Sequence, residues 1–281
     1  TVLKDASAAA IYGARGANGV ILIETKSAGG EDGRVSYNGS LSAGTVADRT
    51  DILGAQQFRQ VVRQEAPTQV GLLGSAQTDW QDQAFRTAVG QEHNVSFARS
   101  YDDSNLRLSL GYLDQEGAIE TSSTRRINGS VKYNQQFFDD QLSVTANLKG
   151  TQTRNSFEPG VVGNAISFAP TQPVRDVRSP YGGFFEWSST IAEKNPVGQY
   201  ILSENNGEEF RSLGNVETEY QVPYVDGLSA RLNLGYDVTT GERELFQPTN
   251  LKQQADADDP GLVQRYTFSR VTSLVDAYLS Y

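Results

Sequence analysis

The chain has 281 residues with a formal net charge of −10, and it contains neither cysteine nor methionine. The lack of cysteine excludes disulfides and thiol chemistry, and an acidic chain without a basic stripe argues against nucleic acid as a partner. Hydrophobic residues make up only 37%, although there are 13 tyrosines and 12 phenylalanines. This balance fits a barrel with a wet lumen, whose apolar side chains are needed mainly on the outer face. Because the chain has no methionine, we expect it to be a fragment of a longer protein.

The first 26 residues predict a short helix, a glycine-rich turn and a strand. Asp5 is a good N-cap for a helix over 6–12. The turn contains Gly13, Gly16 and Gly19. A continuous apolar run over 20–23 then suits a strand that is covered on both faces. Because a helix of two turns is marginal alone, this unit must dock on something larger.

The glycine spacing raises the alternative of a phosphate-binding loop in an α/β nucleotide enzyme. Such loops follow a strand and open a helix, whereas here the helix comes first and the strand last. No Lys-Ser or Lys-Thr pair follows the glycines, and almost no helical pattern follows residue 65. The sequence therefore favours a structural turn.

The string VLKDASAAAIYGARGANGVILIETK resembles the C-terminal end of the plug domain of TonB-dependent outer-membrane transporters. More narrowly, it resembles the SusC/RagA branch, the glycan and nutrient importers of Bacteroidetes. Looser resemblances to the same family follow in the expected order at 78–88, 109–119 and 195–200. The resemblance implies the end of a plug domain and a linker over 1–33, followed by the N-terminal part of a transmembrane β-barrel over 34–281.

Beyond residue 34, apolar and polar residues alternate in segment after segment, which is typical of half-apolar strands. The clearest segments are 35–43, 106–112, 127–133, 142–148 and 228–236. Weaker candidates are 94–101, 210–222 and 265–281. The sequence thus predicts a mainly β fold, an open antiparallel arc of about eight strands. Each should have close to the 9–11 residues that a tilted strand needs to cross a bilayer.

Short and long connections alternate between these segments. The short ones are 102–105, 136–141 and 223–227, and the long ones are 47–92, 115–124, 153–208 and 240–264. Tight periplasmic turns and long outer loops are typical of an outer-membrane barrel. The tyrosines agree with two interfacial belts, although cross-strand aromatic packing is an alternative. Those near short turns are Tyr101, Tyr133 and Tyr220, and those at the opposite ends are Tyr112 and Tyr236.

Two of the long connections have features of their own. The pattern from Ile52 to Val62 predicts a helix that Pro67 ends. The 153–208 segment is too aromatic for a disordered tail. Its candidates for contact with a substrate or partner are Tyr181, Phe184, Phe185 and Trp187. Planar aromatic faces stack on sugar rings or seal against proteins, but packing of the loop on itself or on the plug is the alternative.

For the other conspicuous polar and aromatic residues, the sequence favours a structural role over a binding or catalytic one. Trp80 is interpreted as a packing residue of a recurring motif. The acidic run over 256–259 could hold calcium, but it lacks the glycine and terminal glutamate of a calcium loop. His93 is the sole histidine, so a zinc site or a Ser-His-acid triad is not expected. We expect no catalytic residue, no metal and no cofactor.

The resemblance implies TonB-dependent uptake of oligosaccharides, peptides or other large nutrients across the bacterial outer membrane. It implies a multi-pass barrel in outer-membrane lipid, a SusD-like surface lipoprotein as a lid, and a TonB complex that pulls on the plug. A soluble β-sandwich for carbohydrate binding or adhesion is the alternative. That fold would turn the leucine rows of 106–112 and 228–236 inward, against a second layer.

Overall fold

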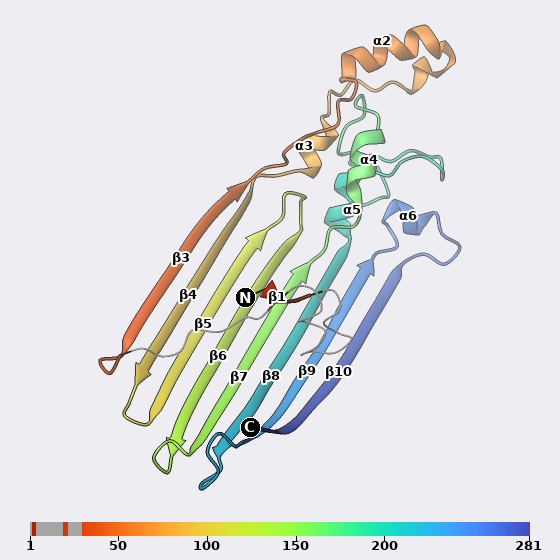
Figure 1. Ribbon diagram of the computed structural model, residues 1–281. Coiled ribbons are helices and arrows are strands. Elements are labelled where there is room, and N and C mark those ends of the chain that lie inside the picture. The colour runs from red at the N-terminus through yellow and green to blue at the C-terminus, as the bar shows by residue number, and fades with distance from the viewer. Residues whose placement is uncertain (1, 4–18, 22–29) are drawn as a thin grey trace.

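The computed structural model describes residues 2–3, 19–21 and 30–281, and most of them belong to one antiparallel sheet (Figure 1). Each strand of the sheet pairs with the next one along the chain. The strands are β3 (Arg34–Gly44), β4 (Ala88–Ser100), β5 (Ser104–Glu116), β6 (Ser123–Phe137), β7 (Leu142–Ser156), β8 (Glu204–Gln221), β9 (Ser229–Gln247) and β10 (Leu262–Ser280). β1 (Val2–Leu3) and β2 (Val20–Ile21) form a separate two-stranded ribbon.

The sheet is open along both edges within the described residues, because β3 pairs only with β4 and β10 only with β9. This confirms the predicted unclosed arc of eight antiparallel strands. β3 has the predicted length with 11 residues, whereas the other strands are longer, up to 19 residues in β9 and β10. The prediction fell short in strands such as β8, whose stretch 204–209 has no apolar side chain on either face, so that hydropathy does not alternate there.

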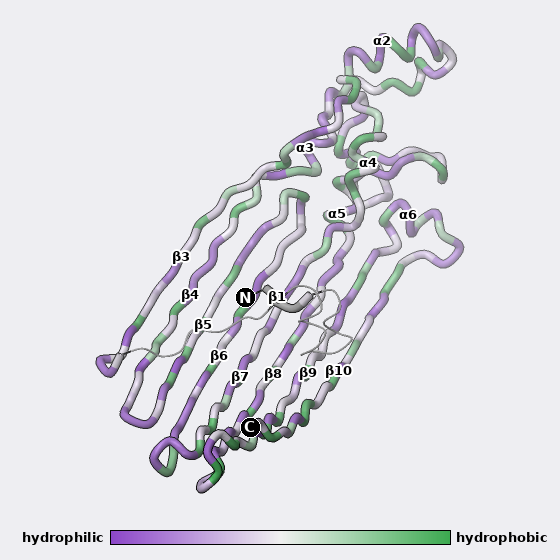
Figure 2. The backbone as a smooth tube through the Cα atoms, viewed as in Figure 1, coloured by the Kyte–Doolittle hydropathy of each residue, from purple (hydrophilic) through white to green (hydrophobic). Residues whose placement is uncertain are grey.

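The two faces of the sheet differ in chemistry, as the alternating colours along the strands show (Figure 2). The pairing aligns Phe97, Leu108, Val131 and Leu148 in one row on one face. It aligns Ser96, Ser109, Ser130 and Lys149 in the adjacent row on the other face. We call these the apolar face and the polar face.

The apolar face is uncovered. The side chains of Leu110 and Leu234 are 67% and 46% exposed, and the described residues form no second layer over them. The β-sandwich alternative required these rows to be buried, and it is therefore wrong.

Connections at one end of the sheet are tight turns, and all described helices lie at the other end (Figure 1). The turns 101–103, 138–141 and 222–228 alternate with the connections 45–87, 117–122, 157–203 and 248–261. The helices are α2 (Ala55–Glu65), η2 (Pro67–Leu72), α3 (Trp80–Ala84), α4 (Val161–Ser167), α5 (Pro196–Leu202) and α6 (Lys252–Ala255). The predicted alternation is confirmed, except that the 117–122 connection is short. No helix among the described residues is long and apolar enough to cross a membrane.

The buried core lies among the helices, beyond the ends of the strands. We call it the loop core; its members are Trp80, Ala84, Val161, Ala165, Phe168, Phe184 and Val197. They come from the connections after β3 and after β7, which are far apart in the sequence. The sheet thus serves as a wall, and the outer connections pack into a small globular cap at one end of it.

Candidate functional site

Trp80 anchors the first outer connection in the loop core. Its side chain is fully buried and packs edge-on against Phe168, with 4.7 Å between ring centroids. Its indole Nε1–H donates to the carbonyl of Ala169 at 3.0 Å, so the one polar atom of the ring is satisfied. Asp79 caps α3 by accepting from the backbone N–H of Asp82. Trp80 is therefore a packing residue, in agreement with the sequence interpretation.

Arg86 joins the same connection to the 117–122 turn. Its guanidinium donates to the carbonyl oxygens of Gly117 at 3.1 Å and Ser122 at 2.8 Å. The carboxylates of Glu116 and Glu120 lie 3.6 and 3.9 Å from it. Since Phe85 also forms a β-bridge with Ile119, this turn is fixed to the loop core.

Asn195 links separate parts of the 157–203 connection through its side chain, which is fully buried. The Oδ1 atom accepts from the N–H groups of Val197 at 3.0 Å and Gly198 at 3.2 Å, which caps α5. The Nδ2 atom donates to the carbonyls of Val174 and Phe185, both at 3.0 Å. Residues from each of the three stretches that resemble the family in sequence meet at the loop core: Trp80 and Val197 belong to it, and Ile119 packs against it.

A buried charged cluster lies next to Asn195. The Glu186 carboxylate accepts from the Asn195 N–H with both oxygens at 3.1 Å, and burial raises the pKa of Glu186 to about 7. Asp256 binds Lys252 and, at 3.2 Å, Lys194. The hydrogen bond from Lys252 above all lowers the pKa of Asp256. The cluster therefore ties the 157–203 connection to α6.

These pairings also bear on the acidic run over 256–259. The oxygens of Asp256 bind ammonium groups, and the described residues contain no group of three or more metal-ligating side chains. His93 lies elsewhere, on the apolar face of β4, where Tyr37 Oη lies 2.7 Å from its Nδ1 atom.

The aromatic candidates fall into two groups. Phe184 is 1% exposed, with the Arg175 guanidinium carbon 3.7 Å from its ring centroid. Phe185 and Trp187 pack edge-on against each other, with 5.3 Å between their ring centroids, and both lie against the loop core. Tyr181 lies apart from them, with Lys252 Nζ 4.7 Å from its ring centroid. Three of the four predicted contact residues are thus brought together, and their contact with a substrate or partner stays a prediction.

The predicted plug residues Asp5, Gly13 and Gly16 lie outside the described residues. Gly19 is described, and its φ of +97° is in the left-handed region that favours glycine. It directly precedes β2, so it fits the turn before the strand that the sequence predicts there.

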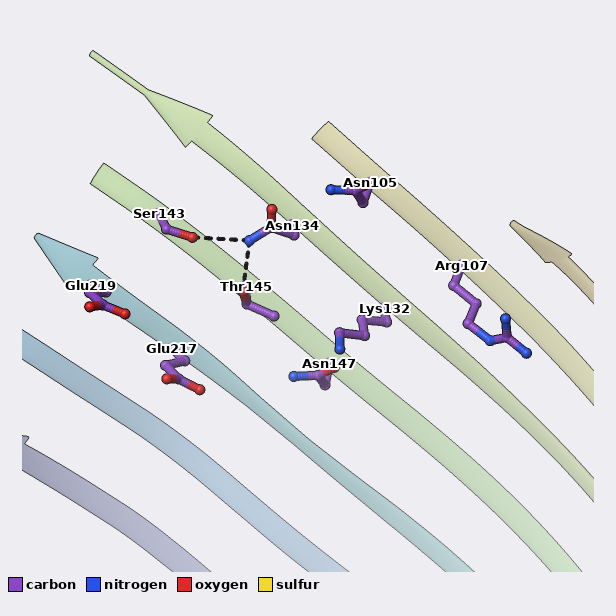
Figure 3. A pocket seen from close by; sticks show the side chains of 9 residues that line it. All are labelled: Asn105, Arg107, Lys132, Asn134, Ser143, Thr145, Asn147, Glu217 and Glu219. Atoms are coloured by element: carbon purple, nitrogen blue, oxygen red, sulfur yellow. Dashed lines mark hydrogen bonds between the residues drawn. The ribbon is translucent and has the colours of Figure 1, made fainter. Parts of the chain in front are cut away.

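The polar face carries a pocket of about 320 Å³ toward the end with the tight turns (Figure 3). Its charged lining residues are Arg107 of β5, Lys132 of β6, and Glu217 and Glu219 of β8. Amides and hydroxyls lie between them, and Asn134 donates to Ser143 and Thr145 at 3.0 and 2.9 Å. Sequence reasoning missed this pocket because only the strand register brings side chains of opposite charge to its two sides.

An amide chain extends the same polar surface. Asn147 donates to Asn215 at 3.0 Å, and Asn215 donates to Asn233 at 2.9 Å, across β7, β8 and β9. These contacts make the polar face a continuous hydrogen-bonding wall rather than a set of separately solvated side chains.

Comparisons with known proteins agree with this architecture. The chain is 36% identical to the TonB-dependent receptor SusC of Bacteroides thetaiotaomicron over 268 residues, which is 86% of this chain and 26% of that receptor. It is 27% identical over its whole length to the TonB-dependent receptor P3 of Formosa agariphila, covering 28% of that protein. No family model matches the chain.

Among solved structures, the chain superposes on the RagAB peptide transporter with a TM-score of 0.78 at 19% identity, covering 98% of this chain and 35% of that one. The closed-closed state of the RagAB importer gives 0.75 at 20% identity, covering 99% and 36%. At these identities the superposition shows the fold alone.

An open antiparallel wall with one apolar and one polar face, capped at one end by interlocked loops, is the architecture of a TonB-dependent receptor barrel. The chain belongs to that class. Within it, the chain is of the SusC/RagA type, and it spans about a quarter of the length of the curated relatives it matches.

Proposed function

We propose that this chain is part of the wall of an outer-membrane importer that takes up large nutrients in a TonB-dependent way. The observation that carries the proposal is the division of the sheet into an exposed apolar face and a hydrogen-bonding polar face. In a membrane barrel the apolar face lies in lipid and the polar face lines the lumen. The location is then the outer membrane of a Gram-negative bacterium, with many strands crossing it.

The connections define the orientation in this proposal. The tight turns lie on the periplasmic side, and the loop core lies outside the cell. Three tyrosines of the apolar face, Tyr112, Tyr133 and Tyr220, support this placement because they lie toward strand ends, where amphipathic rings favour the membrane interface. Tyr236, which the sequence predicted at a strand end, lies near the middle of β9 instead.

The polar wall is the proposed contact surface for the plug. Residues 1–33 are the proposed end of the plug domain and 34–281 the proposed barrel portion. The pocket with Arg107 and Lys132 on one side and Glu217 on the other offers both signs of charge to a docked segment. A TonB complex would pull on plug residues that precede this chain, and the contact would loosen to open a path.

The loop core is the proposed support for capture at the outer face. A SusD-like lipoprotein would cover it as a lid, with an oligosaccharide or a peptide as the cargo. Because Phe184 is buried, Tyr181, Phe185 and Trp187 are the proposed contacts that a ligand or lid can reach. The importer makes and breaks no bond, so it requires no catalytic residue.

Uptake by cells tests the proposal. Cells carrying the full-length receptor should accumulate fluorescently tagged oligosaccharides or peptides that are too large for porins. Accumulation should be lost when either the receptor or TonB is removed. Accumulation that persists without TonB would contradict the proposal, as would a receptor found outside the outer-membrane fraction.

A further inference from the structure

A second pocket of about 510 Å³ opens between the 117–122 turn and the residues that follow β7. Its side-chain lining includes Phe157, Glu158, Asn155, Thr124, Gln115 and Arg243. Strand pairing places Gln115 opposite Thr124, Thr124 opposite Asn155, and Gly207 opposite both Asn155 and Arg243. These residues therefore share one row of the polar face, at the end of the wall that carries the loop core.

Phe157 is an exposed aromatic ring on an otherwise polar surface. Its side chain is 38% exposed, although the rings of the loop core nearby are buried. A Cβ atom at Gly207 would lie 3.0 Å from the ring, so glycine at that position allows the ring to lie against the backbone of β8. The Arg243 guanidinium carbon lies 4.2 Å from the ring centroid. The ring is thus held in place while part of it faces the pocket.

The polar groups around the ring are also held in place. Arg243 Nε donates to Asn205 Oδ1 at 2.8 Å, and Thr124 Oγ1 donates to Asn155 Oδ1 at 2.9 Å. One oxygen of Glu158 accepts from the N–H groups of Gly160 and Val161. Among residues 30–281, these bonds leave the Nδ2 donors of Asn155, the second oxygen of Glu158 and the terminal nitrogens of Arg243 for a ligand.

We propose that this pocket binds one sugar ring of a neutral oligosaccharide. The inference rests on the proposed uptake function and assigns residues to it. Since Arg243 already lies over one face of the Phe157 ring, the apolar face of a sugar ring packs on the exposed part of that ring, and the sugar hydroxyls pair with Asn155, Glu158 and Arg243. Hydroxyls both donate and accept, and this lining offers both kinds of partner. The volume is within the range of small-molecule sites.

The pocket carries no excess of positive charge that would attract acidic sugars. Glu158 and Arg243 line it with one charge of each sign, while the carboxylate of Glu116 lies 3.6 Å from the Arg86 guanidinium and accepts from the Val89 N–H. A uronic acid or a sulfated sugar would place a further negative charge beside Glu158. A peptide is disfavoured because the lining offers one aromatic ring rather than a series of apolar pockets.

Binding by the purified full-length receptor tests the inference, with panels of neutral, carboxylated and sulfated oligosaccharides and of peptides as probes. F157A should weaken binding of the neutral oligosaccharide that the wild type prefers by about tenfold or more. F157W should keep the affinity within about threefold, because the aromatic face remains. The matched control is F246A, since Phe246 is 42% exposed on the apolar face of β9.

The outcomes separate the subsite from the uptake function. If the wild type binds neutral oligosaccharides and F157A binds them equally well, the subsite is overturned while uptake stands. A wild type that prefers acidic sugars or peptides also overturns the subsite. A receptor that binds none of the probes and mediates no uptake contradicts the proposed function itself. Equal losses in F157A and F246A would overturn the subsite as well, because they would indicate a general structural defect.

Discussion

Asn195 uses its whole side-chain amide on backbone groups. Its two acceptor sites cap α5 and its two donors bind the carbonyls of Val174 and Phe185. Replacing it with alanine leaves these buried groups without partners, and we expect N195A to destabilise the loop core by about 3 kcal/mol. Hydrogen exchange of residues 174–202 in the full-length receptor measures this loss of protection. The control is Asn38→Ala, at an exposed position of β3. Equal exchange of residues 174–202 in the two variants would contradict the stabilising role of the Asn195 side chain.

Glu186 should make the loop core sensitive to pH. Burial raises the pKa of Glu186 from its ordinary 4.5 to about 7, so the folded state binds a proton more tightly than the unfolded state does. Its contribution to stability is therefore complete below about pH 4.5 and is lost as the pH rises through about 7. The protection factors of 174–202, in which exchange rates are corrected for the base-catalysed intrinsic rate, should be lower at pH 8 than at pH 5.

E186Q removes this titration while keeping an acceptor for the Asn195 N–H. We expect the variant to show a flatter pH dependence and to be better protected than the wild type at pH 8. An unchanged slope in E186Q would assign the pH dependence to another group.

At the scale of elements, the alternation of side chains predicted the strands well and their ends poorly. The pattern in 106–112 and 142–148 depends only on neighbouring residues, so it can be read without a structure. β8 begins with the stretch 204–209 and β9 contains the stretch 239–244, and neither stretch has an apolar side chain on either face, so the pattern carries no signal there.

The packing of the loop core could not be predicted from the sequence. Trp80 and the 195–200 motif were singled out separately, but their convergence depends on contacts between distant connections. The same holds for Phe157 and Arg243, which meet only because β7, β8 and β9 pair in this register.

One strand allows a direct test of the two faces. Leu148 is 49% exposed on the apolar face of β7, and Thr151 lies on the polar face of the same strand. An arginine in the lipid-facing band of a barrel costs about 2–4 kcal/mol at the bilayer midplane, whereas lumen positions tolerate charge. We expect L148R to be destabilised by about that amount in reversible unfolding from lipid vesicles, and T151R to change little. Similar losses at both positions would contradict the assignment of faces.

At the scale of the whole molecule, the sheet has two open edges and an uncovered apolar face in the part of the chain that the structure describes. Open edges and exposed apolar rows promote aggregation of a protein in water. In the proposed receptor, further strands pair with β3 and β10 and lipid covers the apolar face. The cap of loops then stands outside the membrane, above the pockets of the polar wall.

Collision of spin labels with lipid-soluble and water-soluble relaxants tests this account most directly. Single cysteines would be placed in turn at residues 105–112 of β5 in the full-length receptor in lipid vesicles. The account predicts that labels at 106, 108, 110 and 112 collide mainly with oxygen. Labels at 105, 107, 109 and 111 should collide mainly with a nickel complex in water. Apolar positions that neither reagent reaches, or the reverse alternation, would contradict a wall between lipid and lumen.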